Sequence, residues 1–322
     1  MNALRILVVR LSSMGDVVHT LPAAALLKRS FPNSHLSWLI RPRWAPLLQE
    51  NPFVDEVIPL KRSIGDAWHR MGTLRRERFD LAVDFQGLIQ SAVVAKGACP
   101  VKLVGFGKES VREKPAAFFY SHTFNPAAAH VVDRNIELAV FACGGQPWQD
   151  ASNALREFQL PQGCPEGTLP EGRFVLASPF AGWGSKQWPF EFWGELAALL
   201  EVPLVLNGPA SAEPQLSEVA GAFVHVCGVS GLIDATRRAT AVIGVDSGPL
   251  HVAAALGKPG IALFGPTDPA RNGPYGRSIR VLRVADAVTD YHRREEPDAS
   301  MRALTPAMAA QALTAVLEGC AA

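Results

Sequence analysis

The sequence predicts an α/β protein with two doubly wound domains, each a parallel sheet covered by helices on both faces. Short Val, Ile and Leu runs alternate along the chain with longer segments of helical periodicity, as is typical of buried parallel strands. A Pro- and Gly-rich stretch at 160–173 interrupts this alternation, which starts again after it. A chain of 322 residues, 48% of them hydrophobic, is long enough to form two cores.

The first half contains four apolar runs that predict strands, at 4–10, 35–40, 79–85 and 101–106. Helical periodicity predicts helices over 17–31 and 64–78. Pro22 lies about two turns into the first of these helices, where we expect it to kink the backbone.

The second half repeats the pattern, with strands predicted at 173–178, 202–207, 223–227, 240–246 and 260–265. The segment 190–200 is among the helices predicted between them. We place the domain linker in the stretch 160–173. Two such domains facing each other predict a cleft lined by the loops after the strands, where open α/β sheets bind ligands.

Charge and cysteine content exclude several classes of protein. Lys and Arg number 31 against 30 Asp and Glu, so no global field favours nucleic acid. The five cysteines show neither paired metal-ligand spacing nor a dense disulfide framework, which fits a reducing cytoplasm. No apolar run reaches the roughly 18 to 20 residues of a membrane span, and no signal-peptide pattern starts the chain. We expect a soluble protein, which leaves docking on a membrane face open.

The stretch GVDSGPLHVAAALGKPGIALFGPTDP at 244–269 is the most informative in the chain. A strand ends at Val245, Asp246, Ser247 and Gly248 form a turn, and Pro249 suits the first turn of the next helix. Free N–H groups at that helix start can hold a phosphate. In the simpler alternative, Asp246 or Ser247 only caps the helix, and His251 is an ordinary buried histidine.

A second loop, PFAGWGSKQWPFEFW at 179–193, combines flexible glycines with a single cation, Lys186. A lysine beside a Gly-rich turn is a reasonable phosphate ligand. The dinucleotide fingerprint and the Walker pattern are both absent, so the loop could also be a plain surface turn.

The first half also has a carboxylate in a loop that follows a predicted strand. Asp16 follows the first predicted strand in the loop RLSSMGDVV, and Gln86 follows the third in the turn DFQG. Arg112, Lys114, His130 and Arg134 add basic groups farther along, although recurring basic residues often form only a solvated face.

Four motifs together resemble the family 9 glycosyltransferases, the lipopolysaccharide heptosyltransferases, and most of all their heptosyltransferase I branch. They are SSMGDVVHTLPA, AGWGSKQWP, GVDSGPLHVAAALGKPGIALFGPTDP and MRALTPAMAAQAL, in family order up to about residue 315. The resemblance implies a GT-B fold: an acceptor domain at 1–160, a nucleotide-sugar domain at 161–303, and a last helix at 304–322 that crosses back to the first domain.

The resemblance also implies an activity and its partners. The expected reaction is an inverting, metal-independent transfer of L-glycero-D-manno-heptose from ADP-heptose to Kdo of the lipopolysaccharide inner core. The acceptor is of the Kdo-lipid A type, which places the enzyme in the cytoplasm, peripherally at the cytoplasmic face of the inner membrane. No cofactor and no nucleic-acid partner are expected.

Residue by residue, the resemblance assigns Asp16 as the general base and Lys186 as a ligand of the donor phosphates. The residues expected to bind the donor are Ala181, Gly182, Lys186, Glu213, Asp246, Ser247, Gly248 and His251. Those expected to bind the acceptor are Ser13, Gln86, Arg112 and Arg134. Glu213 is the candidate for the ribose-binding carboxylate.

The chemistry agrees independently with one carboxylate and no metal. Inversion needs a base for the proton of the attacking hydroxyl, whereas a pair of flanking carboxylates is the arrangement of a hydrolase. ADP leaves as a stable anion, so Lys186 and backbone donors can replace an acid. No D-x-D triplet occurs in the chain.

One departure leaves the acceptor open. Heptosyltransferase I often carries a Thr-Thr pair near the donor phosphates, where this chain has Ala181 and Gly182, as other family members do. The alternatives are a family 9 transferase with another acceptor, such as heptosyltransferase II, a nucleotide-sugar epimerase of the same architecture, or a non-catalytic nucleotide-binding protein.

Overall fold

The computed structural model describes residues 3–145 and 157–320 and divides the chain into two compact units. Unit 1 is Met1–Pro161 and unit 2 is Gln162–Ala322. The sequence placed this boundary between residues 160 and 161. The described residues of the predicted linker contain no helix or strand, as its Pro and Gly content indicated.

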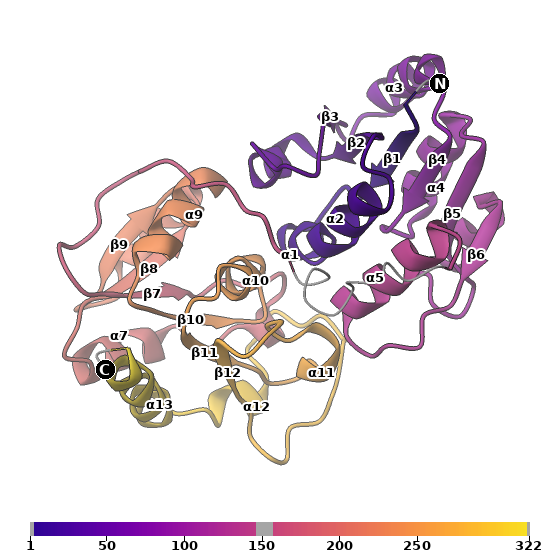
Figure 1. The fold of residues 1–322 in the computed structure, drawn as a ribbon. Helices are drawn as coiled ribbons and strands as arrows, with labels where there is room; N and C mark the ends of the chain where they lie inside the picture. The colour runs from indigo at the N-terminus through magenta and orange to yellow at the C-terminus, as the bar shows by residue number, and fades with distance from the viewer. Residues whose placement is uncertain (1–2, 146–156, 321–322) are drawn as a thin grey trace. The chain divides into compact units, whose positions relative to one another are not determined.

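Unit 1 is built on one sheet of six parallel strands in the order β3-β2-β1-β4-β5-β6 (Figure 1). Its strands are β1 (Arg5–Val9), β2 (His35–Ile40), β3 (Glu56–Pro59), β4 (Leu81–Asp84), β5 (Lys102–Phe106) and β6 (His122–Phe124). The helices of unit 1 are α1 (Met14–Val18), α2 (Leu21–Ser30), α3 (Ile64–Glu77), α4 (Ile89–Gly97) and α5 (Val131–Ala142), with 3₁₀ turns η1 (Pro42–Leu48) and η2 (Lys114–Phe119).

Unit 2 has a second sheet of six parallel strands, in the order β12-β11-β10-β7-β8-β9. Its strands are β7 (Val175–Ser178), β8 (Leu204–Gly208), β9 (Phe223–Val226), β10 (Ala241–Val245), β11 (Gly260–Leu263) and β12 (Ile279–Leu282). Its helices are α7 (Glu191–Leu199), α8 (Glu213–Ser217), α9 (Val229–Arg238), α10 (Gly248–Ala255), α11 (Pro269–Asn272), α12 (Ala299–Arg302) and α13 (Pro306–Gly319), with 3₁₀ turns η3 (Gly184–Lys186) and η4 (Ala210–Ala212). The predicted class of two doubly wound α/β domains is confirmed.

The two sheets share one topology, and this fixes where a ligand can bind. In each, the third strand along the chain lies at an edge, and the fourth returns to pair with the first: β4 beside β1, and β10 beside β7. The strand order reverses at these two pairs, and open α/β sheets bind ligands outside the carboxyl ends of the strands at that point. Ligand-binding residues are therefore expected in the loops after β1, β4, β7 and β10.

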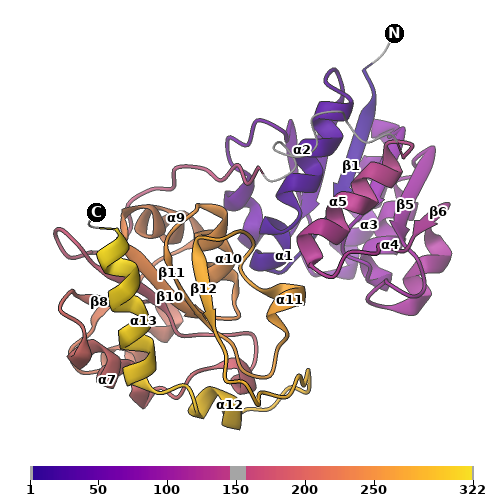
Figure 2. The ribbon, with the colours of Figure 1, turned by 60° about the horizontal axis from the view of Figure 1, so that its bottom comes forward.

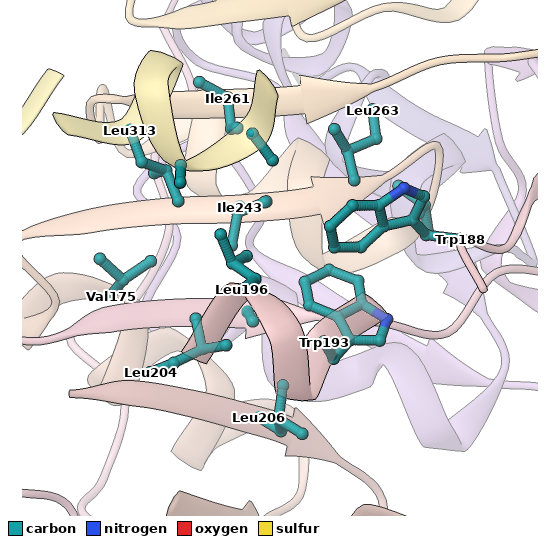
Figure 3. Packing of buried hydrophobic residues seen from close by; sticks show 14 of the residues in the cluster. Val175, Trp188, Trp193, Leu196, Leu204, Leu206, Ile243, Ile261, Leu263 and Leu313 are labelled. Carbon is teal, nitrogen blue, oxygen red and sulfur yellow. The ribbon is translucent and has the colours of Figure 1, made fainter. Parts of the chain in front are cut away.

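The core of unit 2 shows how its loops are anchored. Trp188 and Trp193 are both buried and meet edge to face, with ring centroids 4.9 Å apart, against Ile243 and Leu263 of the central strands (Figure 3). The indole N–H of Trp188 donates a hydrogen bond to the carbonyl oxygen of Leu304 at 2.7 Å, so the buried polar atom is satisfied. The segment just after the Gly-rich loop is thus fixed in the core.

The last helix belongs to unit 2, which corrects the expectation that it crosses back to the first domain. Helix α13 packs against α7 and against strands β10 and β11, and lies beside α7 in Figure 2. Its residue Leu313 is fully buried in the unit 2 core (Figure 3). The apolar face of this helix is needed to cover the sheet of its own unit. No helix in the described part of the chain is long and apolar enough to cross a membrane.

Two further expectations differ from the structure. Strands β3, β6 and β12 were not predicted, because each is a short, partly exposed edge strand without a continuous apolar run. Pro22 does not kink one long helix: α1 ends at Val18, and Pro22 occupies the first turn of α2, where its missing N–H costs no hydrogen bond.

Candidate active site

The carboxylate of Asp16 is held in place by the start of its own helix. Ser13 is the N-cap of α1, and Asp16 is the third residue of that helix. The Ser13 N–H and hydroxyl both donate to Oδ2 of Asp16, at 2.8 and 3.0 Å. A carboxylate in this position also satisfies a free N–H at a helix start, so the sequence Ser-x-x-Asp fixes the side chain locally.

A buried arginine fixes the other carboxylate oxygen. Nη2 of Arg10 lies 2.6 Å from Oδ1 of Asp16, and Nη1 donates to the backbone carbonyl of Phe85. The Arg10 side chain is buried, whereas 27% of the Asp16 side chain is exposed. The exposed end of this pair is therefore the anion, which can receive a hydrogen bond or a proton from a ligand.

The pKa of Asp16 lies below its ordinary value. Burial alone would raise that pKa, but the Arg10 guanidinium, the two hydrogen bonds from Ser13 and the charge of Arg112 outweigh it. The group is therefore a carboxylate throughout the neutral pH range.

The turn after β4 supports the loop that carries Asp16. Oε1 of Gln86 accepts hydrogen bonds from the N–H groups of Leu11 and Ser12 at 2.9 and 3.0 Å. Gln86 is itself held by the fully buried Asp84, which accepts from the Gln86 N–H at 2.8 Å and from the Tyr120 hydroxyl at 2.9 Å. Burial raises the pKa of Asp84, although its hydrogen bonds oppose this. The side-chain amide oxygen of Gln86 thus positions the loop that carries Asp16.

The two arginines predicted to meet the acceptor differ in their surroundings. Arg112 is exposed, and no hydrogen bond or ion pair joins its side chain to another described residue. Arg134 is half-buried on α5 and donates to the carbonyls of Ala128 and Ser110 at 3.4 and 3.5 Å. Arg112 is thus available to a ligand near Asp16, whereas Arg134 supports the loop that carries Arg112.

In unit 2, the loop after β7 brings a lysine onto the carboxylate that follows β10. Nζ of Lys186 lies 2.6 Å from Oδ2 of Asp246, and both side chains are at least nine-tenths buried. Nε2 of His251 lies 3.6 Å from the other oxygen, Oδ1. Burial raises the pKa of Asp246, but the hydrogen bond from His251 and the charge of Lys186 outweigh this and lower it to about 2.

Hydrogen-bond donors without a described partner lie at the start of α10, next to Asp246. Ser247 is the N-cap and Gly248 the first helical residue. The Ser247 hydroxyl oxygen is buried and has no hydrogen-bond partner among residues 3–145 and 157–320. Together with the first N–H groups of the helix, this hydroxyl forms an arrangement suited to an anion.

Trp183 and Arg293 complete the surroundings of Lys186, and sequence reasoning missed both. Nζ of Lys186 lies 4.2 Å from the centre of the Trp183 ring, and Cζ of Arg293 lies 5.2 Å from the same centre. A side chain at Gly184 would collide with the backbone of Glu295, so the glycine permits this close approach. An aromatic residue inside a Gly-rich loop was the available signal for Trp183; nothing local pointed to Arg293.

The remaining predicted donor residues lie in two other segments of unit 2, the start of the loop after β7 and the start of α8. Ala181 packs against the apolar core, and Gly182 is exposed in the loop. Glu213 begins α8 and is exposed; no side-chain hydrogen bond or ion pair links it to another described residue. Its role toward ribose stays a prediction. Within the two described ranges, no group of three His, Cys, Asp or Glu side chains is placed to hold a metal ion.

Comparison with known proteins identifies a family and several similar enzymes. Residues 68–301 match the model of glycosyltransferase family 9 (heptosyltransferase). Lipopolysaccharide heptosyltransferase 1 of Pseudomonas aeruginosa is 30% identical over 305 residues, covering 85% of this chain and 82% of that protein. The enzyme of the same name from Escherichia coli K12 is 29% identical, covering 87% of this chain and 94% of its own.

Solved structures agree with these relatives. The E. coli heptosyltransferase WaaC with ADP has a TM-score of 0.76 at 27% identity, covering 98% of this chain and all of its own. E. coli ADP-heptose lps heptosyltransferase II has a TM-score of 0.79 at 23% identity, which shows the fold alone. These likenesses, with the two parallel sheets, confirm the predicted GT-B class.

The Lys186–Asp246 pair predicts a specific loss of stability in acid. The lowered pKa of Asp246 stabilises the fold fully above its ordinary value of 3.8, and this contribution is lost as the pH falls toward about 2. We expect the free energy of unfolding to drop by roughly 2 kcal/mol more in the wild type than in Asp246→Asn over this interval. Urea titrations at a series of pH values measure this difference, and parallel pH profiles would contradict it.

Proposed function

The chain belongs to glycosyltransferase family 9, and from that membership we propose that it transfers heptose from ADP-L-glycero-D-manno-heptose to Kdo of the lipopolysaccharide inner core. Relatives that are 29% and 30% identical to the chain carry the name lipopolysaccharide heptosyltransferase 1. The observation that carries the proposal for the site is the partly exposed Asp16 carboxylate at the strand-order reversal of unit 1. Unit 2 supplies an anion site at the equivalent place.

Asp16 acts as the general base in this proposal. The acceptor hydroxyl oxygen forms a bond to the anomeric carbon of the heptose while its proton passes to the Asp16 carboxylate. The bond from that carbon to the diphosphate breaks, and its electron pair leaves with ADP. The lowered pKa keeps Asp16 deprotonated and makes it a weak base. A weak base suffices because the hydroxyl becomes acidic only as its bond to carbon forms.

Unit 2 binds the donor in this proposal. Lys186, the Ser247 hydroxyl and the first N–H groups of α10 contact the diphosphate. Asp246 holds Lys186 and faces the heptose, and His251 lies against the other oxygen of Asp246. Charge grows on the diphosphate as the sugar bond breaks, so donors fixed in advance stabilise the transition state more than the ground state. These groups, with no D-x-D triplet in the chain, support a metal-independent mechanism.

The acceptor lies on unit 1 in this proposal. Kdo carries a carboxylate, and Arg112 is an exposed cation whose charge already acts on Asp16. Heptosyltransferase II is the second candidate: the E. coli K12 enzyme of that kind is 27% identical over 358 residues. The pair Ala181 and Gly182 keeps this candidate open.

The deciding experiment is a transfer assay with ADP-heptose and two separate acceptors. Product formed on Kdo-lipid A supports the proposed step, whereas product formed only on an acceptor that already carries one heptose identifies the second candidate. Conversion of the donor with no acceptor present would indicate an epimerase.

Asp16→Asn tests the base. We expect turnover to fall by roughly 10²- to 10⁴-fold, because the amide cannot take the proton, while ADP binding is unchanged. Asp66→Asn is the matched control, since Asp66 also occupies the third position of a helix capped by a serine, Ser63. Steady-state kinetics on a deacylated acceptor compare the two variants, and equal turnover would remove Asp16 from this role.

Chelation tests the metal-independent mechanism. We expect transfer to continue at an unchanged rate in excess EDTA, because Lys186 and backbone donors balance the charge of the departing diphosphate. Initial rates after extensive dialysis against EDTA measure this. A rate that vanishes and returns with added magnesium or manganese would contradict it.

Lys186→Ala and Arg112→Ala separate the two substrates. Loss of a charged hydrogen bond costs about 1.5–3 kcal/mol when it is shielded from water, or roughly tenfold to a hundredfold. We expect Lys186→Ala to weaken use of ADP-heptose and ADP binding, and Arg112→Ala to raise KM for the acceptor. Kinetics with each substrate varied in turn show the split. The opposite pattern would reverse the assignment of the two units.

A further inference from the structure

Three neighbouring elements of unit 1 form a continuous outer surface. Helix α3 packs against α4, and α4 packs against η2; the first two are labelled in Figure 1. The side chain of Arg41 links the segment before α3 to the start of α4, since it donates to the backbone carbonyl of Leu60 at 2.9 Å and to Oε1 of Gln90 at 2.7 Å. We call this surface, residues 61–78, 89–97 and 107–119, the α3–η2 face.

Large apolar side chains protrude from the α3–η2 face. Ile64 and Trp68 lie one helical turn apart on α3 and are 78% and 71% exposed. Ile89 and Val93 repeat this spacing on α4, and Phe118 of η2 is 73% exposed. Single exposed apolar residues are ordinary, but five on three packed elements indicate a surface that meets an apolar partner.

The same face concentrates positive charge. It holds ten of the 31 Lys and Arg residues in the chain, but only four of the 30 Asp and Glu residues. Nζ of Lys108 lies 4.6 Å from the centre of the exposed Phe118 ring, so a cation borders an apolar side chain directly. The nearly neutral composition of the whole chain hides this local excess.

This combination favours one kind of partner. A bilayer of anionic lipids offers negative headgroups to Lys and Arg, and an apolar layer beneath them to Trp and Ile. Long basic side chains can keep their charge among the headgroups while their stems lie along apolar surface. A second copy of the chain does not fit, because it would bring two positively charged faces together.

We propose that the α3–η2 face docks the protein on an anionic membrane surface. This inference deepens the proposed function and rests on it for its purpose, because a lipid-linked acceptor presents its sugars at such a surface. Arg112 lies within the face, and its charge acts on Asp16. Docking therefore holds the lipid surface beside the proposed base.

Vesicle binding tests the proposal without donor or acceptor. The full chain is mixed with vesicles of phosphatidylethanolamine and phosphatidylglycerol, or with phosphatidylcholine vesicles, and the bound fraction is measured by flotation. We expect binding to the anionic vesicles alone, weakening as salt is added. Equal binding to both kinds of vesicle, or to neither, would overturn the proposal.

Two double variants separate the apolar and the charged contributions. Ile64→Ser with Trp68→Ser should weaken vesicle partitioning by about tenfold, because it removes the inserted side chains. Arg62→Gln with Arg76→Gln should weaken it by about 25-fold, at about fivefold for each lost charge. All four side chains are exposed, so we expect the fold to tolerate both variants.

Matched controls lie on unit 2. Phe223→Ser removes an aromatic side chain that is 52% exposed, and Arg277→Gln with Arg280→Gln removes two exposed charges. Each should change partitioning by less than about twofold. Equal losses from the control and the test variants would overturn the proposed location.

Activity on a water-soluble, deacylated acceptor distinguishes this proposal from the proposed function. The four substitutions at Arg62, Ile64, Trp68 and Arg76 should leave that activity unchanged while they reduce activity on acceptor embedded in vesicles. Transfer to the soluble acceptor without any vesicle binding would overturn docking and leave the transferase proposal standing. Vesicle binding lost in both double variants, in a protein that transfers nothing, would support docking and overturn the proposed function.

Discussion

The pairing of two particular parallel strands in each sheet is the constraint on which both sites depend. Val9 pairs with Asp84 in unit 1, and Gly244 pairs with Ser178 in unit 2. Neighbouring strands lie only about 4.8 Å apart, so the loops that follow them must begin side by side. Arg10 can therefore reach both Asp16 and the carbonyl of Phe85, and Lys186 can reach a carboxylate 60 residues farther along the chain.

The sequence predicts the central strands well because they are buried on both faces and read as continuous apolar runs. It predicts the edge strands β3, β6 and β12 poorly, since their half-exposed residues show no such run. The last helix illustrates a different limit. Its apolar stripe indicates that one face is buried, but only the packing of Leu313 on β10, β11 and α7 decides which unit it covers.

The same distinction applies to the candidate site. Asp16, Lys186 and Asp246 could be selected from the sequence because each follows an apolar run in a turn of small residues. Their surroundings depend on tertiary structure: the contact of Arg293 with Trp183, or the hydrogen bonds from Leu11 and Ser12 to Gln86, joins segments far apart in the chain. The structure therefore adds a supporting role for Gln86, because its side-chain amide oxygen accepts hydrogen bonds from the Asp16 loop.

The two ion pairs are built for different tasks. The Arg10–Asp16 pair leaves part of its anion exposed, as the role proposed for Asp16 requires. The Lys186–Asp246 pair is buried at both ends. Burying a lone charge costs free energy, and the Asp246 carboxylate 2.6 Å from Nζ of Lys186 offsets that cost. An ammonium group has three N–H groups, so Lys186 can keep its hydrogen bond to Asp246 while it also contacts the diphosphate of the proposed substrate. The free-energy cost of burying its charge is therefore met during folding and does not recur when that substrate binds.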